Sequence, residues 1–210
     1  MSRRPLLVPV VEGQAEVEAV PVLLRRLLHA AGVFDIDVGV PHFRHRSEMV
    51  RSEEHLRRIV TVASFEPGCR GILVLLDADD DCPKHLREKL EPWAAGAARG
   101  VPCRVVAPNR EFEAWFLASM ESLRTHRGIS AEAVSEEKPE MRRNAKKAVE
   151  RWMTGRSYKE RTDQPALTAH LDLARAHRMS RSFRHLCKAL GELVCAAGAT
   201  LPEWPPPSWG

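Results

Sequence analysis

Three groups of acidic residues stand out because each follows an apolar segment with the composition of a buried β-strand. In chain order they are Glu12 and Glu16, then Asp77, Asp79 and Asp81, and finally Glu111 and Glu113. Carboxylates that gather at one point repel each other unless protons or cations compensate their charge. Oxygen ligands of this kind suit Mg²⁺ or Mn²⁺. If the chain brings the three groups together, it can hold one or two divalent ions.

The alternation of apolar runs and helical spacing predicts how these acids are positioned. We expect strands at 6–11, 34–40, 71–76 and 101–106, and helices at 15–31, 48–65, 83–99 and 111–120. Short connections favour parallel pairing with right-handed crossovers, and continuous apolar strands favour a sheet that is covered on both faces. Ligands of such sheets bind outside the carboxyl ends of the strands. The acidic groups should therefore meet at that edge.

The fold class expected from this pattern is α/β, with a Rossmann-like, mostly parallel four-stranded sheet flanked by helices and a C-terminal helical extension. Residues 1–124 would form the core, residues 125–201 the extension packed on it, and residues 202–210 a Pro-rich, extended tail. Within the extension we expect helices at 141–152, 166–177 and 180–197, and irregular segments at 127–140 and 155–164.

The composition indicates a folded globular protein. Lys and Arg exceed Asp and Glu by 32 to 28, which permits nucleic acid as a partner without requiring it. The five cysteines form no CxxC pair, and Cys82 and His85 have no second ligand pair beside them, so we expect reduced thiols rather than a zinc site. No apolar stretch reaches the ~20 residues of a membrane helix. We therefore expect a cytoplasmic protein without membrane contact.

Several enzyme classes lack their fingerprints in this chain. No GxGxxG follows the first expected strand, no GxxxxGK(S/T) indicates an ATP-hydrolysing P-loop, and no GxSxG elbow indicates a serine hydrolase. A haloacid-dehalogenase phosphatase would carry its DxD nucleophile after the opening strand, whereas here Asp77-Ala78-Asp79 follows the third.

Two motifs resemble the TOPRIM fold, which occurs in topoisomerases, bacterial primases and the overcoming-lysogenisation-defect (OLD) nucleases. They are Val11-Glu12-Gly13-Gln14-Ala15-Glu16 after the first expected strand and Asp77-Ala78-Asp79 after the third. The glutamate one helical turn after Glu12 is closest to the OLD-type branch. Further stretches resemble an uncharacterised family of small, stand-alone TOPRIM-like proteins: NREFEAWF at 109–116, Tyr158-Lys159 with Asp163-Gln164, and Ser180-Arg181-Ser182-Phe183. The likeness spans nearly the whole chain.

The resemblance implies a metal-dependent nuclease that hydrolyses nucleic-acid phosphodiesters. The residues that it assigns to metal binding are Glu12, Asp77 and Asp79 for a first ion, with Glu16 in support, and Glu111 or Glu113 for a second ion. We add Asp81, from the same acidic run as Asp77 and Asp79, as a further candidate ligand. Lys159 would be the catalytic lysine, neutralising charge that develops on the phosphate. OLD-type enzymes carry an ATPase domain and this chain shows none, so any ATPase would be a separate partner protein, in defence against phage or plasmids.

Basic residues would bind the substrate through its phosphates. They are Arg110, Arg178, Arg181, Arg184 and Lys188. Other interpretations stay open, because each acid taken alone could end a strand or cap a helix, and Lys159 could be a solvated loop lysine. The main alternative is a non-catalytic protein that keeps the TOPRIM fold and binds nucleic acid or regulates. A phosphomonoesterase or nucleotide hydrolase is a third possibility.

Overall fold

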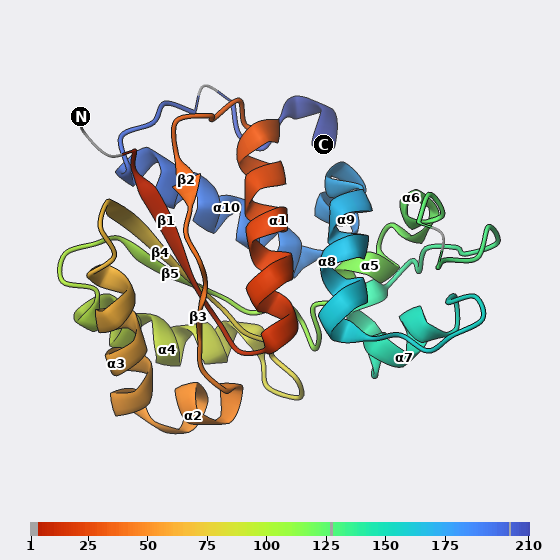
Figure 1. Cartoon of the computed structure of the whole chain (residues 1–210), viewed down its shortest axis with the longest axis horizontal. Helices are drawn as coiled ribbons and strands as arrows, with labels where there is room; N and C mark the ends of the chain where they lie inside the picture. Colours follow the sequence, from red (N-terminus) through yellow and green to blue (C-terminus); the bar gives the residue numbers. More distant parts are fainter. Residues whose placement is uncertain (1–3, 127, 202) are drawn as a thin grey trace.

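A parallel β-sheet forms the centre of the molecule (Figure 1). The computed structural model describes residues 4–126, 128–201 and 203–210. The strands are β1 (Leu6–Val11), β2 (Asp37–Val38), β3 (His42–Phe43), β4 (Cys69–Leu75) and β5 (Cys103–Val106). They follow the order β2-β1-β4-β5, with β3 also paired to β1, and these pairings are parallel. The predicted α/β class with a mostly parallel sheet is confirmed.

The edge of the sheet beside β1 is made of two short strands. Leu7 of β1 pairs with β2 and Val11 pairs with β3, so β2 and β3 occupy successive stretches of the same edge. Between them lies Pro41, which has no backbone N–H to donate to a neighbouring strand. The sequence predicts one strand at 34–40; the structure forms only β2 within that range and adds β3 after the proline.

Helices cover both faces of the sheet. They are α1 (Gln14–Ala30) and α10 (Arg181–Ala196) on one face, and α3 (Glu53–Ser64) and α4 (Pro83–Ala97) on the other. Successive side chains of a strand point to opposite faces, so Leu7 packs in the layer of α1 and Val8 in the layer of α3. Each fully buried Val or Leu stabilises the fold by about 1.5–3 kcal/mol relative to an exposed one.

The helices that follow β1 and β4 lie on opposite faces of the sheet. From β1 the chain returns through α1 to the β2 edge, whereas from β4 it continues through α4 to β5. This reversal creates a topological switch point between the neighbouring strands β1 and β4. At a switch point a crevice forms outside the carboxyl ends of the strands. Glu12 and Asp77 follow β1 and β4, so the fold brings both acids to this crevice.

The helix predicted at 48–65 is interrupted at Ser52. The first part, α2 (Arg46–Arg51), ends there, and α3 begins directly afterwards. Ser52 has an extended backbone, and its hydroxyl accepts a hydrogen bond from the backbone N–H of His55, which caps α3. The interruption makes α2 a separate short helix.

After β5 the chain forms short helices that gather beside the sheet (Figure 1). They are α5 (Ala114–Leu117), α6 (Met120–Leu123), the 3-10 turn η1 (Pro139–Met141), α7 (Ala145–Glu150), α8 (Glu160–His170) and α9 (Leu173–Met179). The chain turns at Leu171, and Asp172 then caps α9 by accepting a hydrogen bond from Arg175 N, so the helix predicted at 166–177 is two helices. None of the helices in the described part of the chain is long and apolar enough to cross a membrane.

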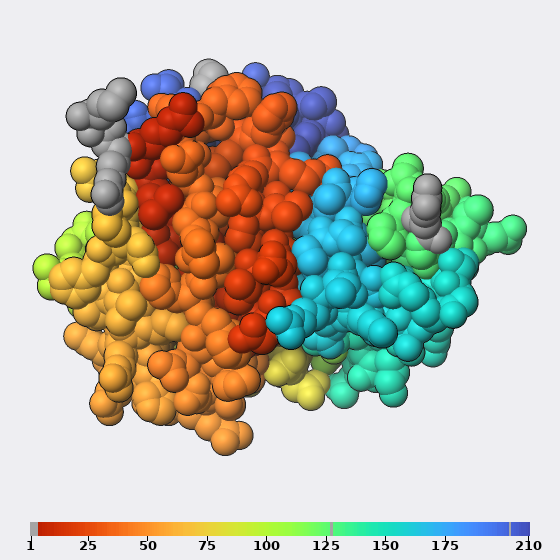
Figure 2. Space-filling view, viewed as in Figure 1, coloured from red at the N-terminus to blue at the C-terminus, as the bar shows by residue number. Residues whose placement is uncertain are grey.

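The helices of the C-terminal extension are built into the core. α8 packs along α1, where Arg26 Nη1 donates to Thr168 O at 2.7 Å, and α10 packs on β4 and β5. Figure 2 shows the α8 segment in direct contact with α1 on the surface of the molecule. The division between residues 1–124 and residues 125–201 therefore runs through a continuous hydrophobic core.

The tail folds back onto α10 rather than extending away as the sequence predicts. Trp204 Nε1 donates a hydrogen bond of 2.7 Å to Cys187 O, and Trp209, in the 3-10 turn η2 (Pro207–Trp209), is buried. Residue 202 of the predicted tail and residue 127 of the predicted loop lie outside the described residues.

Candidate functional site

Two glutamates stand where β1 passes into α1. Val11 pairs with Leu75 of β4, so Glu12, the next residue, lies beside the end of the neighbouring strand. Glu16 stands in the first turn of α1 and is buried. Gly13 lies between them in an extended conformation, and a β-carbon there would collide with the Glu16 carboxylate. With Glu16 in this position, there is no room for a side chain at position 13.

Asp77 enters the same crevice from β4. Its side chain is buried, and its Oδ1 accepts a hydrogen bond of 2.8 Å from the backbone N–H of Phe112. The loop after β4 is also joined to the loop after β5, because Asp79 N donates to Arg110 O at 2.9 Å. Asp79 and Arg110 have positive φ angles of 51° and 69°. These contacts fix Asp77 on the inner side of two connected loops.

Glu113 comes from the segment after β5 and is fully buried. Its Oε1 accepts hydrogen bonds from the Tyr158 hydroxyl at 2.9 Å and from Gln164 Nε2 at 3.2 Å. Gln164 Nε2 also lies 3.1 Å from Oε1 of Glu16, so one amide group of α8 bridges two carboxylates. Tyr158 and Gln164 belong to the stretches that carry the TOPRIM resemblance, which assigned them no role.

The buried acids raise one another's pKa values. Burial raises the pKa of Glu12 to about 8; a hydrogen bond with the backbone of Asp77 opposes this, and the charge of Glu16 adds to it. Burial also raises the pKa of Asp77 well above its ordinary value, followed by the charges of Glu12 and Glu113. Burial raises the pKa of Glu113 to about 7, against the opposing charge of Lys146. Such mutual effects require the carboxylates to lie close together.

The amino group of Lys146 faces these carboxylates from α7. Its Nζ lies 3.3 Å from Oε2 of Glu160, at the start of α8. Burial alone would lower the pKa of Lys146, but the charges of Glu113, Asp77 and Glu160 outweigh burial and raise the pKa above its ordinary value. Lys146 therefore stays protonated and partly balances the charge of the buried acids.

Arg46, at the start of α2, holds the loop that follows β4. Its Nε donates to Asp77 O at 2.7 Å, and its Nη2 donates to Ala78 O at 2.9 Å. The same guanidinium pairs with two exposed carboxylates, Asp81 Oδ2 at 2.6 Å and Asp79 Oδ2 at 3.2 Å. Asp81 is thus engaged by Arg46 outside the crevice. No role for Arg46 was predicted from the sequence.

Glu111 and Glu113, two residues apart, have different surroundings. Glu111 Oε2 accepts a hydrogen bond of 3.0 Å from the backbone N–H of Lys146, in the first turn of α7. Glu111 therefore caps α7, whereas Glu113 points into the crevice. Of the predicted acids, the structure gathers in the crevice Glu12, Glu16, Asp77 and Glu113.

Two adjoining hollows open at this end of the sheet. The first has a volume of about 360 Å³ and is lined by Glu12, Gly13, Glu16, His45, Arg46, Ser47, Asp79, Lys146 and Glu160. The second, of about 330 Å³, shares Asp79 with it and is also lined by Asp80, Arg110, Glu111, Arg143 and Asn144. Asp79 therefore stands on the rim between the two hollows.

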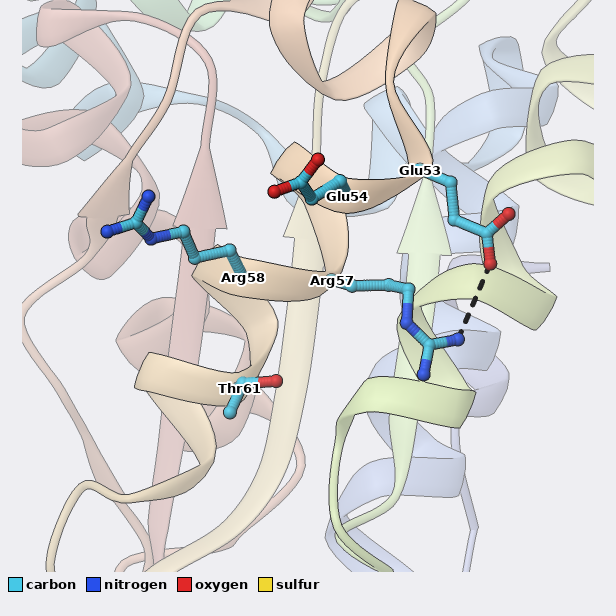
Figure 3. A pocket seen from close by; sticks show the side chains of 5 residues that line it. All are labelled: Glu53, Glu54, Arg57, Arg58 and Thr61. Atoms are coloured by element: carbon cyan, nitrogen blue, oxygen red, sulfur yellow. Dashed lines mark hydrogen bonds and ion pairs between the residues drawn. The ribbon is translucent and has the colours of Figure 1, made fainter.

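A larger hollow of about 630 Å³ lies on the outer surface of α3 (Figure 3). Its lining residues come from that helix alone, and Glu53 pairs there with Arg57 at 3.4 Å. Because no second element contributes a functional group, this hollow offers no converging chemistry.

A protein-family model matches residues 11–191, a range that includes every residue of the site described above. The family is described as a domain of unknown function, DUF4276. The chain belongs to the DUF4276 family. No curated protein and no solved structure matches the chain.

Lys159, the lysine that the sequence selects, stands at the start of α8 in this DUF4276 protein. Its side chain is exposed and makes no hydrogen bond or ion pair within the described residues, while its backbone N–H donates to Asp163 Oδ2 at 2.7 Å. Lys146 lies in the crevice instead. One feature of the sequence could have indicated that Lys146 faces inward. Val149, an apolar residue, follows three positions later, and this spacing puts both residues on one face of a helix.

The predicted nucleic-acid contacts of the DUF4276 chain lie in two places. Arg110 stands on the rim of the second hollow, where its Nη1 donates to Asp80 Oδ1 at 2.8 Å. The others are exposed on α9 and α10: Arg178, Arg181, Arg184 and Lys188. Within the described residues, the guanidinium groups of Arg178 and Arg181 have no acidic partner.

The oxygen atoms of the crevice are of the kind that bind divalent cations. Three are buried without a hydrogen-bond partner in the described part of the chain, namely Glu12 Oε2, Glu113 Oε2 and Gln164 Oε1. Burial of an unpaired polar atom is costly, and a bound cation would remove that cost. Across residues 4–126, 128–201 and 203–210, no three His, Cys, Asp or Glu side chains are already spaced to hold an ion. Binding therefore requires the carboxylates to rotate.

Proposed function

We propose that this protein is a metal-dependent nuclease of TOPRIM type, which hydrolyses nucleic-acid phosphodiesters with Mg²⁺ or Mn²⁺. The observation that supports it most is the convergence of Glu12, Asp77 and Glu113 at the switch point of a parallel sheet. These acids are distant in sequence and costly to bury together. A non-catalytic scaffold gains nothing from carboxylates that repel each other. At a cation site, the bound ion offsets that repulsion.

The residues of the crevice have separate tasks in this proposal. One or two ions would be held by Glu12, Glu16, Asp77, Asp79 and Glu113. A divalent ion supplies activation of water and stabilisation of the leaving oxygen in phosphodiester cleavage. Tyr158 and Gln164 both donate to Oε1 of Glu113, which orients that carboxylate and leaves Oε2 free for a ligand.

Positive groups outside the crevice would bind the phosphates on either side of the cleaved bond. Arg110 and Arg143 both approach Asp80 at the second hollow, with Nη1 to Oδ1 distances of 2.8 and 3.7 Å. The exposed arginines of α9 and α10 would extend this contact. Glu140 of η1 accepts a hydrogen bond of 3.1 Å from Arg181 N and so joins α10 to the segment that leads to Arg143. Lys and Arg contacts of this type bind phosphates without reading sequence.

The resemblance to OLD-type nucleases supports a biological setting as part of the proposal. The protein would act in the cytoplasm, in defence against phage or plasmids, beside a separate ATPase. The observation that supports this setting is the likeness of the two acidic motifs to those of OLD-type nucleases.

The decisive test is cleavage of plasmid and single-stranded oligonucleotides in Mg²⁺ or Mn²⁺ by the wild type and by Asp77→Asn. Asparagine keeps an oxygen that can accept the Phe112 N–H, so the variant should fold, and its activity should fall by about 100-fold or more. The matched control is Asp35→Asn, an exposed acid without a role in the site.

Each other outcome points to a different function. Equal cleavage by wild type and Asp77→Asn would contradict the proposed site. Binding of nucleic acid without cleavage under any metal would support the non-catalytic alternative. Release of inorganic phosphate from small substrates would support a phosphomonoesterase or nucleotide hydrolase.

A further inference from the structure

We infer that Lys146 is the catalytic lysine that contacts the phosphate undergoing cleavage, an inference that rests on the nuclease function proposed above. Lys146 lines the hollow that also contains Glu12, Glu16 and Asp79. Its amino group is therefore positioned where a phosphate held beside those acids would lie.

The backbone around Lys146 fixes the direction of its side chain. Its own N–H donates to Glu111 Oε2 at 3.0 Å, which joins the first turn of α7 to the segment after β5. Ala145 and Val149, on either side of it in α7, are fully buried. The helix is thus anchored at positions 145, 146 and 149, which fixes the point from which the Lys146 side chain extends.

The amino group has capacity for a substrate. An ammonium group carries three N–H donors, and the ion pair of Lys146 Nζ is with a single oxygen, Glu160 Oε2 at 3.3 Å. The Glu160 side chain is half exposed, so water can replace the lysine as its partner. Lys146 can therefore turn from Glu160 to a phosphate oxygen, where its charge stabilises the negative charge of the transition state.

Neither Arg46 nor Lys159 combines a place in the hollow with unused donors. Arg46 lines the same hollow, but its guanidinium is bonded to the carbonyls of Asp77 and Ala78 and to nearby carboxylates. Lys159 has an exposed side chain without contact to the acids in the part of the chain that the structure describes. Lys146 alone of these three combines a place in the hollow with unused donors.

The sign of the charge provides a test that separates a catalytic role from a structural one. A cation that binds beside Lys146 is repelled by the ammonium group, so removal of that charge should leave Mn²⁺ affinity unchanged or make it stronger. Removal of a phosphate contact should instead reduce cleavage by about 100-fold. A residue that merely supported the fold would lower both Mn²⁺ affinity and cleavage.

The experiment compares Lys146→Gln with Lys147→Gln, an exposed neighbour on the same helix, and with Lys159→Gln. Mn²⁺ binding is measured by titration calorimetry, and cleavage of a single-stranded oligonucleotide under single-turnover conditions. We expect loss of cleavage with intact Mn²⁺ binding in Lys146→Gln, partial rescue in Lys146→Arg, and wild-type behaviour in Lys147→Gln. Lys146→Met, which keeps the aliphatic stem, replaces Lys146→Gln if that variant does not fold.

Two results would overturn the inference while the nuclease function stands: normal cleavage by Lys146→Gln, or loss of cleavage in Lys159→Gln alone. If the wild type cleaves no nucleic acid with any metal, the proposed function fails instead. The phosphate contact of Lys146 is then tested by the Mn²⁺-dependent affinity of the protein for a labelled oligonucleotide. An affinity that is unchanged in Lys146→Gln would refute this contact.

Discussion

At the scale of single residues, Gly13 controls where the Glu16 carboxylate lies. A methyl group at this position would meet Oε2 of Glu16, whose flexible side chain must then turn away from the crevice. Gly13→Ala should therefore weaken Mn²⁺ binding by about 10–100-fold, the range for loss of orienting contacts around a metal, with little change in stability. Titration calorimetry and thermal unfolding measure the two effects.

The control for Gly13→Ala is Gly96→Ala, in the exposed face of α4, where the added carbon meets only the far end of Arg57. This variant should bind Mn²⁺ normally and gain slightly in stability, because alanine favours a helix interior over glycine. Unchanged Mn²⁺ affinity in Gly13→Ala would show that Glu16 takes no part in holding an ion.

The buried acids make the stability of the metal-free protein depend on pH. Glu12, with a pKa of about 8, and Glu113, with a pKa of about 7, keep their protons in the folded state over a range where the unfolded chain releases them near 4.5. The unfolded state thus binds fewer protons, and the free energy of unfolding falls as the pH rises from 4.5 to 8. The loss should be on the order of a few kcal/mol.

Urea unfolding in EDTA across this pH range measures the effect. Glu12→Gln, which cannot ionise, should flatten the profile, and Mn²⁺ should restore stability most at the alkaline end because carboxylate ligands must be deprotonated. Stability of the metal-free wild type that rises with pH would contradict the assignment of these two acids as buried and protonated.

The sequence predicted the meeting of Glu12, Asp77 and Glu113 because parallel strands deliver their carboxyl ends to one edge whatever the loops do. The sequence did not indicate which of Glu111 and Glu113 lies in the crevice. Both follow β5 closely, and the choice depends on the positive φ of Arg110 and on the docking of α7 against Glu111. Such contacts arise between segments that no local pattern connects.

At the scale of secondary-structure elements, α10 depends on a carboxylate from another segment. Glu140 of η1 accepts hydrogen bonds from the Ser180 hydroxyl at 2.6 Å and from the backbone N–H groups of Arg181 at 3.1 Å and Ser182 at 2.7 Å. Glu140→Ala leaves these donors at the helix N-terminus unpaired and should lower the free energy of unfolding by about 1–3 kcal/mol. Urea denaturation, with the exposed Glu137→Ala as control, measures the loss; equal stability of both variants would contradict this capping role.

Long elements were predictable and short ones were not. The strands at 6–11 and 71–76 and the helix at 15–31 have strong apolar periodicity, and the structure forms them within two residues of the predicted ends. The helix predicted at 48–65 fails at Ser52, because a serine hydroxyl caps the helix that follows and so favours a new start over continuation. At Ser52, a local side-chain contact outweighs the average helix preference of the surrounding residues.

At the scale of the whole molecule, the hydrophobic core on one face of the sheet is incomplete without the C-terminal helices. Leu73 and Leu75 of β4 share one hydrophobic core with Leu186 and Leu190 of α10, and Trp115 Nε1 donates to Ser182 Oγ at 2.9 Å within it. The composition changes after residue 124, but the short helices around the site begin earlier, at Ala114, and the hydrophobic core continues across residue 124.

A fragment of residues 1–124 should therefore fail to fold on its own. It would expose the face of the sheet that α10 covers and the side of α1 that α8 covers, and each large apolar side chain left in water forfeits about 1.5–3 kcal/mol, more in sum than the 5–15 kcal/mol by which a typical domain is stable. The full chain should unfold in one cooperative transition, whereas the fragment should show a poorly dispersed proton–nitrogen NMR spectrum and no urea transition. A dispersed spectrum with cooperative unfolding of the fragment would instead mean that the first 124 residues fold by themselves, and that α10 and α8 are additions to a complete core.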